Sequence, residues 1–147
     1  KEESHLPGQI MTELLEKAGG AVKGLMGGMG GRYLVDEYRR GSAGTMPAGH
    51  ITDAHVKLWN ALDAGGIDSE GLQIVTDEAR TIWERMIPSL NFEFMFGANA
   101  YKAAYWRRGI IKTPLTRNPA NKTLDKLDYA ELDTILNRMS NLLDAKI

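Results

Sequence analysis

The chain has 147 residues, of which 18 are lysine or arginine and 19 are aspartate or glutamate, so its formal net charge at pH 7 is -1. This length fits one domain with a substantial core, and the near-neutral balance argues against a basic nucleic-acid-binding face. Cysteine is absent, which excludes disulfides, thiolate metal sites and a cysteine nucleophile, and fits a reducing, cytoplasmic location. No apolar run approaches the roughly 18 residues of a membrane span, and no signal-peptide pattern is present, so we expect no membrane partner. Because the chain begins Lys1-Glu2-Glu3-Ser4 without methionine, we expect a fragment or a processed chain.

The first part of the chain predicts alternating helices and short strands. Helices are predicted at Gln9–Lys17, at Arg32–Arg40 and from a cap at Thr52 or Asp53 to Gly65-Gly66, and strands at Ala21–Met26 and Ala43–Ala48. The inward face of the first helix is Ile10, Leu14 and Leu15, and that of the second is Leu34, Val35 and Tyr38. Strands separated by helices of this length imply parallel, right-handed βαβ units, whose ligands bind at the carboxyl ends of the strands. Two strands alone cannot make a stable parallel sheet. We therefore expect another chain, or upstream residues of a larger barrel or open sheet, to complete it.

After Gly66 the pattern is entirely helical. A helix is predicted at Ser69–Ile87, where Pro88 stops it, and an aromatic, alanine-rich helix at Phe92–Arg108. The stretch 112–126 has two prolines and no periodicity, which predicts a loop. A capping box of Asp128 and Glu131 precedes the last helix, whose inward face is Leu132, Ile135, Leu136, Met139 and Leu143.

A glycine-rich segment, Gly27-Gly28-Met29-Gly30-Gly31, follows the first predicted strand and is called the glycine turn below. Thr45-Met46-Pro47 lies at the carboxyl end of the second predicted strand, so both segments are expected side by side at one edge of the sheet. Glycine permits positive φ and can leave backbone N–H groups exposed at the start of the next helix, which would make an anion site. The alternative from glycine content alone is a flexible loop.

Other patterns that carry chemistry are weak or absent. His50-x-x-Asp53-x-His55 has metal-ligating residue types, but His55 falls on the inward stripe of a helix and Asp53 is placed to cap it, so no metal site is predicted. The Walker A, G-x-G-x-x-G and G-x-S-x-G motifs are missing. The aromatic residues of 92–106 have helical spacing, which favours a core or a subunit interface over a cofactor site. Lys1 and Lys23 are both candidate amines, and spacing alone promotes neither.

Several segments together resemble the dihydrodipicolinate synthase / N-acetylneuraminate lyase family. They are Lys1-Glu2-Glu3, the glycine turn with Arg32, Gly41-Ser42-Ala43-Gly44-Thr45-Met46-Pro47-Ala48, and, in the family's helical extension, Pro88–Phe92, Tyr101-Lys102 and Arg107–Ile111. The resemblance covers nearly the whole chain, which corresponds to the C-terminal half of a family member. It implies an α/β fold: residues 1–66 as the last two strands and their helices of a (β/α)8 TIM barrel, and residues 67–147 as a helical C-terminal extension. The missing N-terminal part of the barrel would come from the same gene product or another chain, usually within a homotetramer.

The resemblance also implies site residues. By resemblance, Lys1 is the strand-six lysine that forms a Schiff base, and Ala21–Met26 and Ala43–Met46 are strands seven and eight. Gly27, Gly28 and Gly30 would then line the substrate, and Met46 matches an apolar residue whose backbone faces it. The family's proton-relaying tyrosine and the threonine-bearing turn that holds the carboxylate precede this chain.

The implied activity is that of a class I lyase, an aldolase or dehydratase acting on pyruvate, a 2-keto-3-deoxy sugar acid or another 2-oxo acid. The Schiff base itself is the electron sink, so neither a metal nor a cofactor is expected. Thr45-Met46-Pro47-Ala48 departs from the serine-containing run usual in lysine-biosynthetic members and favours the sugar-acid branch. Dihydrodipicolinate synthesis is the alternative within the class, and a non-catalytic module that keeps the fold is the alternative outside it.

Overall fold

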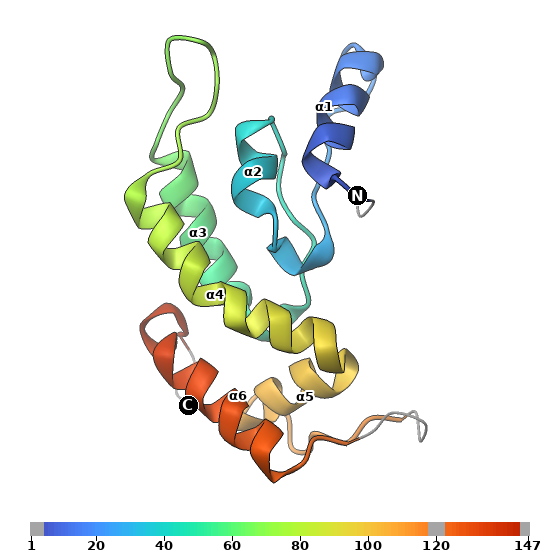
Figure 1. Cartoon of the computed structure of the whole chain (residues 1–147), viewed down its shortest axis with the longest axis vertical. Helices are drawn as coiled ribbons and strands as arrows, with labels where there is room; N and C mark the ends of the chain where they lie inside the picture. Colours follow the sequence, from blue (N-terminus) through green and yellow to red (C-terminus); the bar gives the residue numbers. More distant parts are fainter. Residues whose placement is uncertain (1–4, 118–122, 145–147) are drawn as a thin grey trace. The chain divides into compact units, whose positions relative to one another are not determined.

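The computed structural model describes residues 5–117 and 123–144 (Figure 1). Over these residues the chain is mostly helical and forms no strand. The α-helices are α1 (Pro7–Ala18), α2 (Leu34–Arg39), α3 (Thr52–Asp63), α4 (Asp77–Phe96), α5 (Ala98–Arg107) and α6 (Lys126–Arg138), and the short 3-10 helices are η1 (Met29–Gly31), η2 (Gly49–Ile51) and η3 (Ser140–Leu142).

The chain divides into two compact units. The first unit comprises Lys1–Pro47 and His55–Trp83, and the second unit comprises Ala48–Ala54 and Glu84–Ile147. The division into 1–66 and 67–147, which follows from the family resemblance, stays a prediction.

Helix α1 forms where the sequence predicts it. Pro7 starts the helix, where its missing N–H has no helical partner to lose, and Gly19 ends it in the left-handed conformation, with φ 51 and ψ 33. Met11 is fully buried, whereas Leu14, predicted on the inward face, is 39% exposed. Since the predicted Ile10 is only half-buried, the inward face centres on Met11.

Helix α2 confirms its predicted inward face, because Leu34, Val35 and Tyr38 are all buried. It is shorter than predicted, with six residues. The Tyr38 ring packs edge-on against Trp59, with ring centroids 5.3 Å apart, and its hydroxyl donates to Asp63 at 3.1 Å. These contacts join α2 to α3 inside the first unit.

The two predicted strands do not form, so the barrel strands are not seen in the described residues. Their ends pair instead through an isolated parallel bridge between Gly27 and Thr45. The Gly27 N–H donates to the Gly44 carbonyl at 2.9 Å, and the Met46 N–H donates to the Gly27 carbonyl at 3.0 Å. A parallel ladder needs partners on its edges to hold strands extended, and within residues 5–117 and 123–144 no further strand lies beside these two segments. The strand prediction is therefore wrong, whereas the parallel pairing of the two segments is as predicted.

Helix α3 follows its predicted bounds, but α4 begins later than predicted, at Asp77 instead of Ser69. The residues between them form a tight turn, because Ile67 and Gln73 make an antiparallel bridge. Within it the Asp68 carboxylate accepts the N–H groups of Glu70 and Leu72, both at 2.9 Å. An aspartate that binds nearby backbone in this way competes with a helix.

Helix α4 also continues through Pro88, so the prediction that Pro88 ends the helix is wrong. The buried residues Met86 and Leu90 stand four apart on either side of this proline. Proline costs one backbone hydrogen bond, and burial of a continuous apolar stripe offsets that loss. The helix ends instead at Gly97, which separates α4 from α5 with φ 53 and ψ -126.

Helix α6 begins with a capping box, three residues before the predicted one. The Asp125 carboxylate accepts the N–H groups of Leu127 and Asp128, and the Asp128 carboxylate accepts the N–H of Asp125 at 2.8 Å. The predicted inward face is confirmed, since its members are all buried: Leu132, Ile135, Leu136, Met139 and Leu143.

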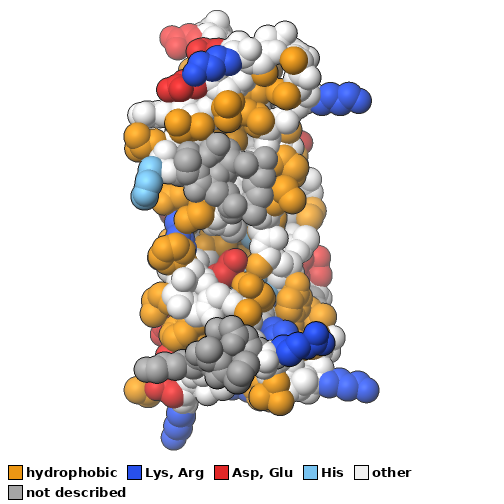
Figure 2. All heavy atoms as spheres, turned by 90° about the vertical axis from the view of Figure 1, so that its right-hand side faces the viewer, with side chains coloured by type: hydrophobic (Ala, Val, Ile, Leu, Met, Phe, Trp, Pro, Cys, Tyr) orange, Lys and Arg blue, Asp and Glu red, His pale blue; other side chains and the backbone are white. Residues whose placement is uncertain are grey.

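Large hydrophobic side chains are also exposed, as the orange side chains at the surface in Figure 2 show. In the first unit these residues are Leu6, Leu14, Val22, Met26, Tyr33, Met46, Val56, Ile67, Leu72 and Ile74. Of the helices in the described residues, none is both long enough and apolar enough to cross a membrane.

Candidate functional site

The glycine turn has three consecutive residues in the left-handed region of backbone space. The φ angles are 52 for Met29, 69 for Gly30 and 84 for Gly31. Glycine adopts such angles without steric cost, whereas Met29 is strained by them. Inside the turn, the N–H of Gly31 donates to the Gly28 carbonyl at 3.0 Å, and that of Arg32 to the Met29 carbonyl at 3.2 Å. The segment is therefore a hydrogen-bonded turn and not an open loop.

The predicted anion site at this turn depended on a helix that starts directly after it. Helix α2 starts only at Leu34, and Tyr33 is its N-terminal flanking residue. The N–H groups of Gly31 and Arg32 are already used inside the turn. These two N–H groups therefore bind inside the turn, and an anion site at the turn stays a prediction.

The predicted substrate-lining residues lie in two adjacent segments. Gly27 and Gly28 are buried, and Gly30 is half-buried. Met46 has a side chain that is 50% exposed, while its backbone N–H binds the Gly27 carbonyl. The structure thus brings the glycine turn and Met46 together, as expected for neighbouring strand ends. Lys1, the predicted Schiff-base lysine, lies outside the described residues, and Lys23 is exposed.

Side chains from two helices bind the glycine turn. From α3, the His55 Nε2 atom lies 2.8 Å from the Gly30 carbonyl oxygen. From α4, the Trp83 indole N–H donates to the Arg32 carbonyl at 3.1 Å. A Cβ added to Gly31 would lie 3.0 Å from His55 Nε2, so a larger residue there would press against the imidazole as well as strain the backbone at φ 84. The conformation of the turn is therefore set by tertiary contacts as well as by its glycines.

Glu37 of α2 is a second feature that the sequence did not single out. It is fully buried, and its carboxylate lies so close to Gly27 that a Cβ there would overlap with it. Packing against Glu37 therefore favours glycine at position 27. The available signal was the spacing, because Glu37 stands three residues after Leu34, on the inward side of α2.

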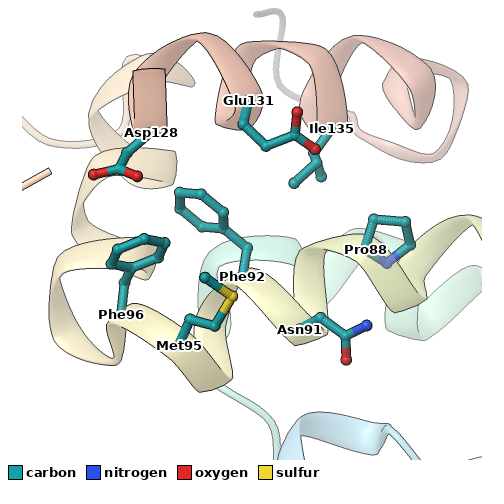
Figure 3. A pocket seen from close by; sticks show the side chains of 8 residues that line it. All are labelled: Pro88, Asn91, Phe92, Met95, Phe96, Asp128, Glu131 and Ile135. Atoms are coloured by element: carbon teal, nitrogen blue, oxygen red, sulfur yellow. The ribbon is translucent and has the colours of Figure 1, made fainter. Parts of the chain in front are cut away.

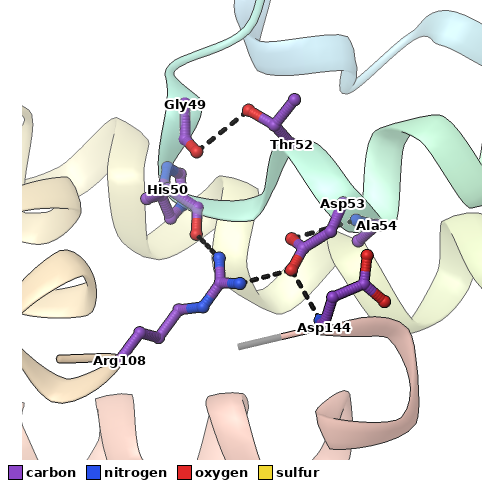
Figure 4. Close-up of polar contacts among 7 residues, drawn as sticks. All are labelled: Gly49, His50, Thr52, Asp53, Ala54, Arg108 and Asp144. Atoms are coloured by element: carbon purple, nitrogen blue, oxygen red, sulfur yellow. Dashed lines mark hydrogen bonds and ion pairs between the residues drawn. The ribbon is translucent and has the colours of Figure 1, made fainter. Parts of the chain in front are cut away.

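The residues of the weak metal pattern have other partners (Figure 4). In the second unit, the Arg108 guanidinium donates to the Asp53 carboxylate and to the His50 carbonyl. The same carboxylate accepts the Asp144 N–H at 2.8 Å. The His50 ring is buried, with Nε2 3.2 Å from the Ser89 hydroxyl. Within the described part of the chain, no group of three histidine, aspartate or glutamate side chains is placed to hold a metal ion.

An apolar pocket of about 270 Å³ lies in the second unit between α4 and α6 (Figure 3). Phe92 and Phe96 lie side by side in it, with ring centroids 4.7 Å apart, and Ile135 faces them from α6. Asp128 and Glu131 add two carboxylates to its lining. Phe92 and Phe96 thus contribute to a pocket wall, whereas Phe94 is 69% exposed. Another aromatic contact, Trp106 against Tyr129, lies between α5 and α6.

Comparison with known proteins gives a likeness among solved structures. No protein-family model matches the sequence, and no curated protein matches it. Among solved structures, the chain is similar to dihydrodipicolinate synthase from Rhodopseudomonas palustris, with a TM-score of 0.78 and 23% sequence identity. The likeness covers 94% of this chain and 44% of that chain, so this chain spans less than half the length of its match. The resemblance predicted from the sequence is thereby confirmed at the level of the fold: the chain has the fold of part of a dihydrodipicolinate synthase.

Proposed function

We propose that this protein is a class I, Schiff-base-forming lyase, an aldolase or dehydratase that acts on a 2-oxo acid such as pyruvate or a 2-keto-3-deoxy sugar acid. The observation that carries the proposal is the fold likeness to part of a dihydrodipicolinate synthase. The Lys1-Glu2-Glu3 start and the glycine-turn motif support it from the sequence. Lys1 supplies the amine, and Gly27, Gly28, Gly30 and Met46 form the wall beside the substrate.

The chemistry follows from the requirements of an amine nucleophile. A free lysine has a pKa near ~10.4 and must lose its proton before it attacks a carbonyl, which an apolar setting promotes. The neutral amine adds to C2 of the 2-oxo acid, and loss of one water molecule gives the protonated imine. The imine draws the electron pair of the breaking C–C bond in an aldol cleavage, or of the departing C3 proton in a dehydration. Hydrolysis then returns the product and the free lysine.

Borohydride trapping tests the proposal directly. Pyruvate is added to the assembled protein, the imine is reduced, and peptide mass spectrometry locates the added group. We expect the mass of one reduced pyruvate on Lys1 in the wild type and in Lys23→Ala, and no such mass in Lys1→Ala. Lys23 is the matched control, because it is exposed and stands shortly before the glycine turn in the sequence. Trapping that survives Lys1→Ala would reject Lys1 as the Schiff-base residue.

Dihydrodipicolinate synthesis is the second candidate, because the matched structure is a dihydrodipicolinate synthase. The two activities separate when pyruvate with aspartate semialdehyde is compared with a panel of 2-keto-3-deoxy sugar acids. Turnover of the sugar acids alone supports the aldolase or dehydratase, as the Thr45-Met46-Pro47-Ala48 segment favours. A folded assembly that forms no adduct with any 2-oxo acid would instead be a non-catalytic module.

We also propose that the remaining barrel strands come from the same gene product or from another chain, in a homotetramer. The support is that the chain spans 44% of its match, and that hydrophobic residues beside the paired segments, Val22, Met26 and Met46, are exposed. Native mass spectrometry of the purified protein tests this. A monomer that binds pyruvate without further residues would contradict it.

A further inference from the structure

The glycine turn cannot hold its observed conformation by its own residues alone. It places Met29, Gly30 and Gly31 in succession at positive φ, and only two of these are glycines. A non-glycine residue in this region persists where surrounding structure determines it, and glycines lose more conformational entropy on ordering than any other residue. The turn therefore depends on contacts from elsewhere in the first unit.

Two such contacts bind the carbonyl of Gly30, inside the turn, and that of Arg32, directly after it. The Gly30 carbonyl is only an acceptor, so His55 must carry its proton on Nε2 to bind it at 2.8 Å. The Trp83 N–H binds the Arg32 carbonyl at 3.1 Å. His55 is 6% exposed, so its hydrogen bond is shielded from water. The two donors come from different helices, α3 and α4, and both bind carbonyls, which a strained turn would otherwise leave to solvent.

We propose that His55 and Trp83 are positioning residues that fix the glycine turn and, through it, the wall of the 2-oxo acid site. We call the two hydrogen bonds, from His55 to Gly30 and from Trp83 to Arg32, the clamp. The clamp rests on the geometry alone, whereas its effect on substrate binding rests on the proposed function. The turn begins with Gly27, whose carbonyl binds the Met46 N–H at 3.0 Å. A shift of the turn would therefore move both predicted substrate-lining segments. A preformed wall saves the free energy of ordering it when substrate binds.

Hydrogen–deuterium exchange tests the clamp independently of any activity. The reporters are the N–H groups of Gly31 and Arg32, which donate inside the turn. We expect about two- to tenfold faster exchange there in His55→Asn and in Trp83→Phe, because each loses one hydrogen bond. His55→Gln should exchange as the wild type does, because its amide N–H reaches the place of Nε2 and that of asparagine does not.

Trp59→Phe is the matched control, since Trp59 belongs to the same unit but contacts Tyr38. Exchange in α3 serves as a fold check, and Trp83→Phe keeps the test decisive if the His55 variants fail to fold. Wild-type exchange across residues 27–33 in both His55→Asn and Trp83→Phe would overturn the clamp.

The consequence for substrate is tested by the pyruvate concentration that half-saturates borohydride trapping. We expect it to rise about two- to tenfold in His55→Asn and Trp83→Phe and to return to the wild-type value in His55→Gln, with the maximal trapped fraction unchanged because Lys1 is intact. Faster hydrogen–deuterium exchange in the turn, with an unchanged pyruvate concentration for half-saturation, would overturn the positioning role. If the wild-type protein forms no adduct with pyruvate, the proposed function is rejected. The exchange experiment still shows whether His55 and Trp83 hold the turn.

Discussion

Replacing Arg108 by alanine should severely destabilise the second unit. The Arg108 side chain is 4% exposed and that of Asp53 is 12% exposed, and the guanidinium also donates to the His50 carbonyl (Figure 4). Removing one partner leaves the other charge nearly buried without its counterion, which costs about 3–5 kcal/mol. Since domains are typically stable by about 5–15 kcal/mol, the loss is a large fraction of the total. In urea unfolding followed by circular dichroism, the midpoint should fall by on the order of 2 M.

The neighbouring Arg107, the last residue of α5, provides a matched control. It pairs with Asp133 at 2.7 Å, but the two side chains are 29% and 43% exposed. Its guanidinium also lies over the Trp106 ring at 4.5 Å and the Tyr129 ring at 4.9 Å. A solvated pair with such aromatic contacts contributes about 1–2 kcal/mol, so Arg107→Ala should cost clearly less than Arg108→Ala. Equal costs for the two variants would refute the burial argument. The double variant Arg108→Ala with Asp53→Ala should unfold at higher urea than Arg108→Ala, because it removes the orphaned carboxylate.

Two further predictions concern Tyr38 and Pro88. Burial of Tyr38, and then its hydrogen bond to Asp63 and the repulsion by that carboxylate, raise the pKa of its phenol above the ordinary 10.0. Because the pKa is raised in the folded state, the associated stability is present below pH ~10 and is lost as the pH rises through the folded pKa. The wild type should be more stable than Tyr38→Phe by about 1 kcal/mol at pH 7, and this difference should shrink in unfolding curves above pH ~10. A difference that stays constant with pH would contradict the assignment. Pro88 lies inside α4 and is exposed, so Pro88→Ala should restore a helical hydrogen bond and raise the free energy of unfolding by about 1–3 kcal/mol, and a lower value than in the wild type would show that the proline ring is needed for packing.

The helical faces could be predicted from the sequence because they depend on local periodicity. Leu34, Val35 and Tyr38 are buried as predicted, and so are Leu132 and Leu136. Errors arose where a second interaction competes with the local pattern. The Asp68 carboxylate binds the N–H groups of Glu70 and Leu72, so the polar start of the predicted helix at Ser69 became a turn. The strands failed for a related reason, since extended segments need partners that the described residues do not contain.

The contacts that shape the site could not be predicted, because they join residues far apart in the sequence. His55 stands 25 residues after Gly30, and Trp83 stands 51 residues after Arg32. No local period or motif pairs such positions. The sequence showed His55 on an inward stripe, which it shares with ordinary core residues, and Trp83 carried no signal at all. The sequence did show the segment that these residues bind, a run of glycines whose backbone is too flexible to be ordered by its own residues.

The two parts of the proposed site, Lys1 and the glycine turn, need different kinds of evidence. A nucleophilic lysine leaves no local trace beyond its identity, and one fold carries many activities, so the role of Lys1 depends on chemical trapping. The glycine turn is different, because its φ angles, its bonds to His55 and Trp83, and the packing of Glu37 against Gly27 all constrain the same short segment. A non-catalytic module could keep every one of these constraints, since they stabilise the fold without any substrate. The turn therefore shows how a wall beside a 2-oxo acid would be built, and only the adduct on Lys1 shows that the wall is used for chemistry.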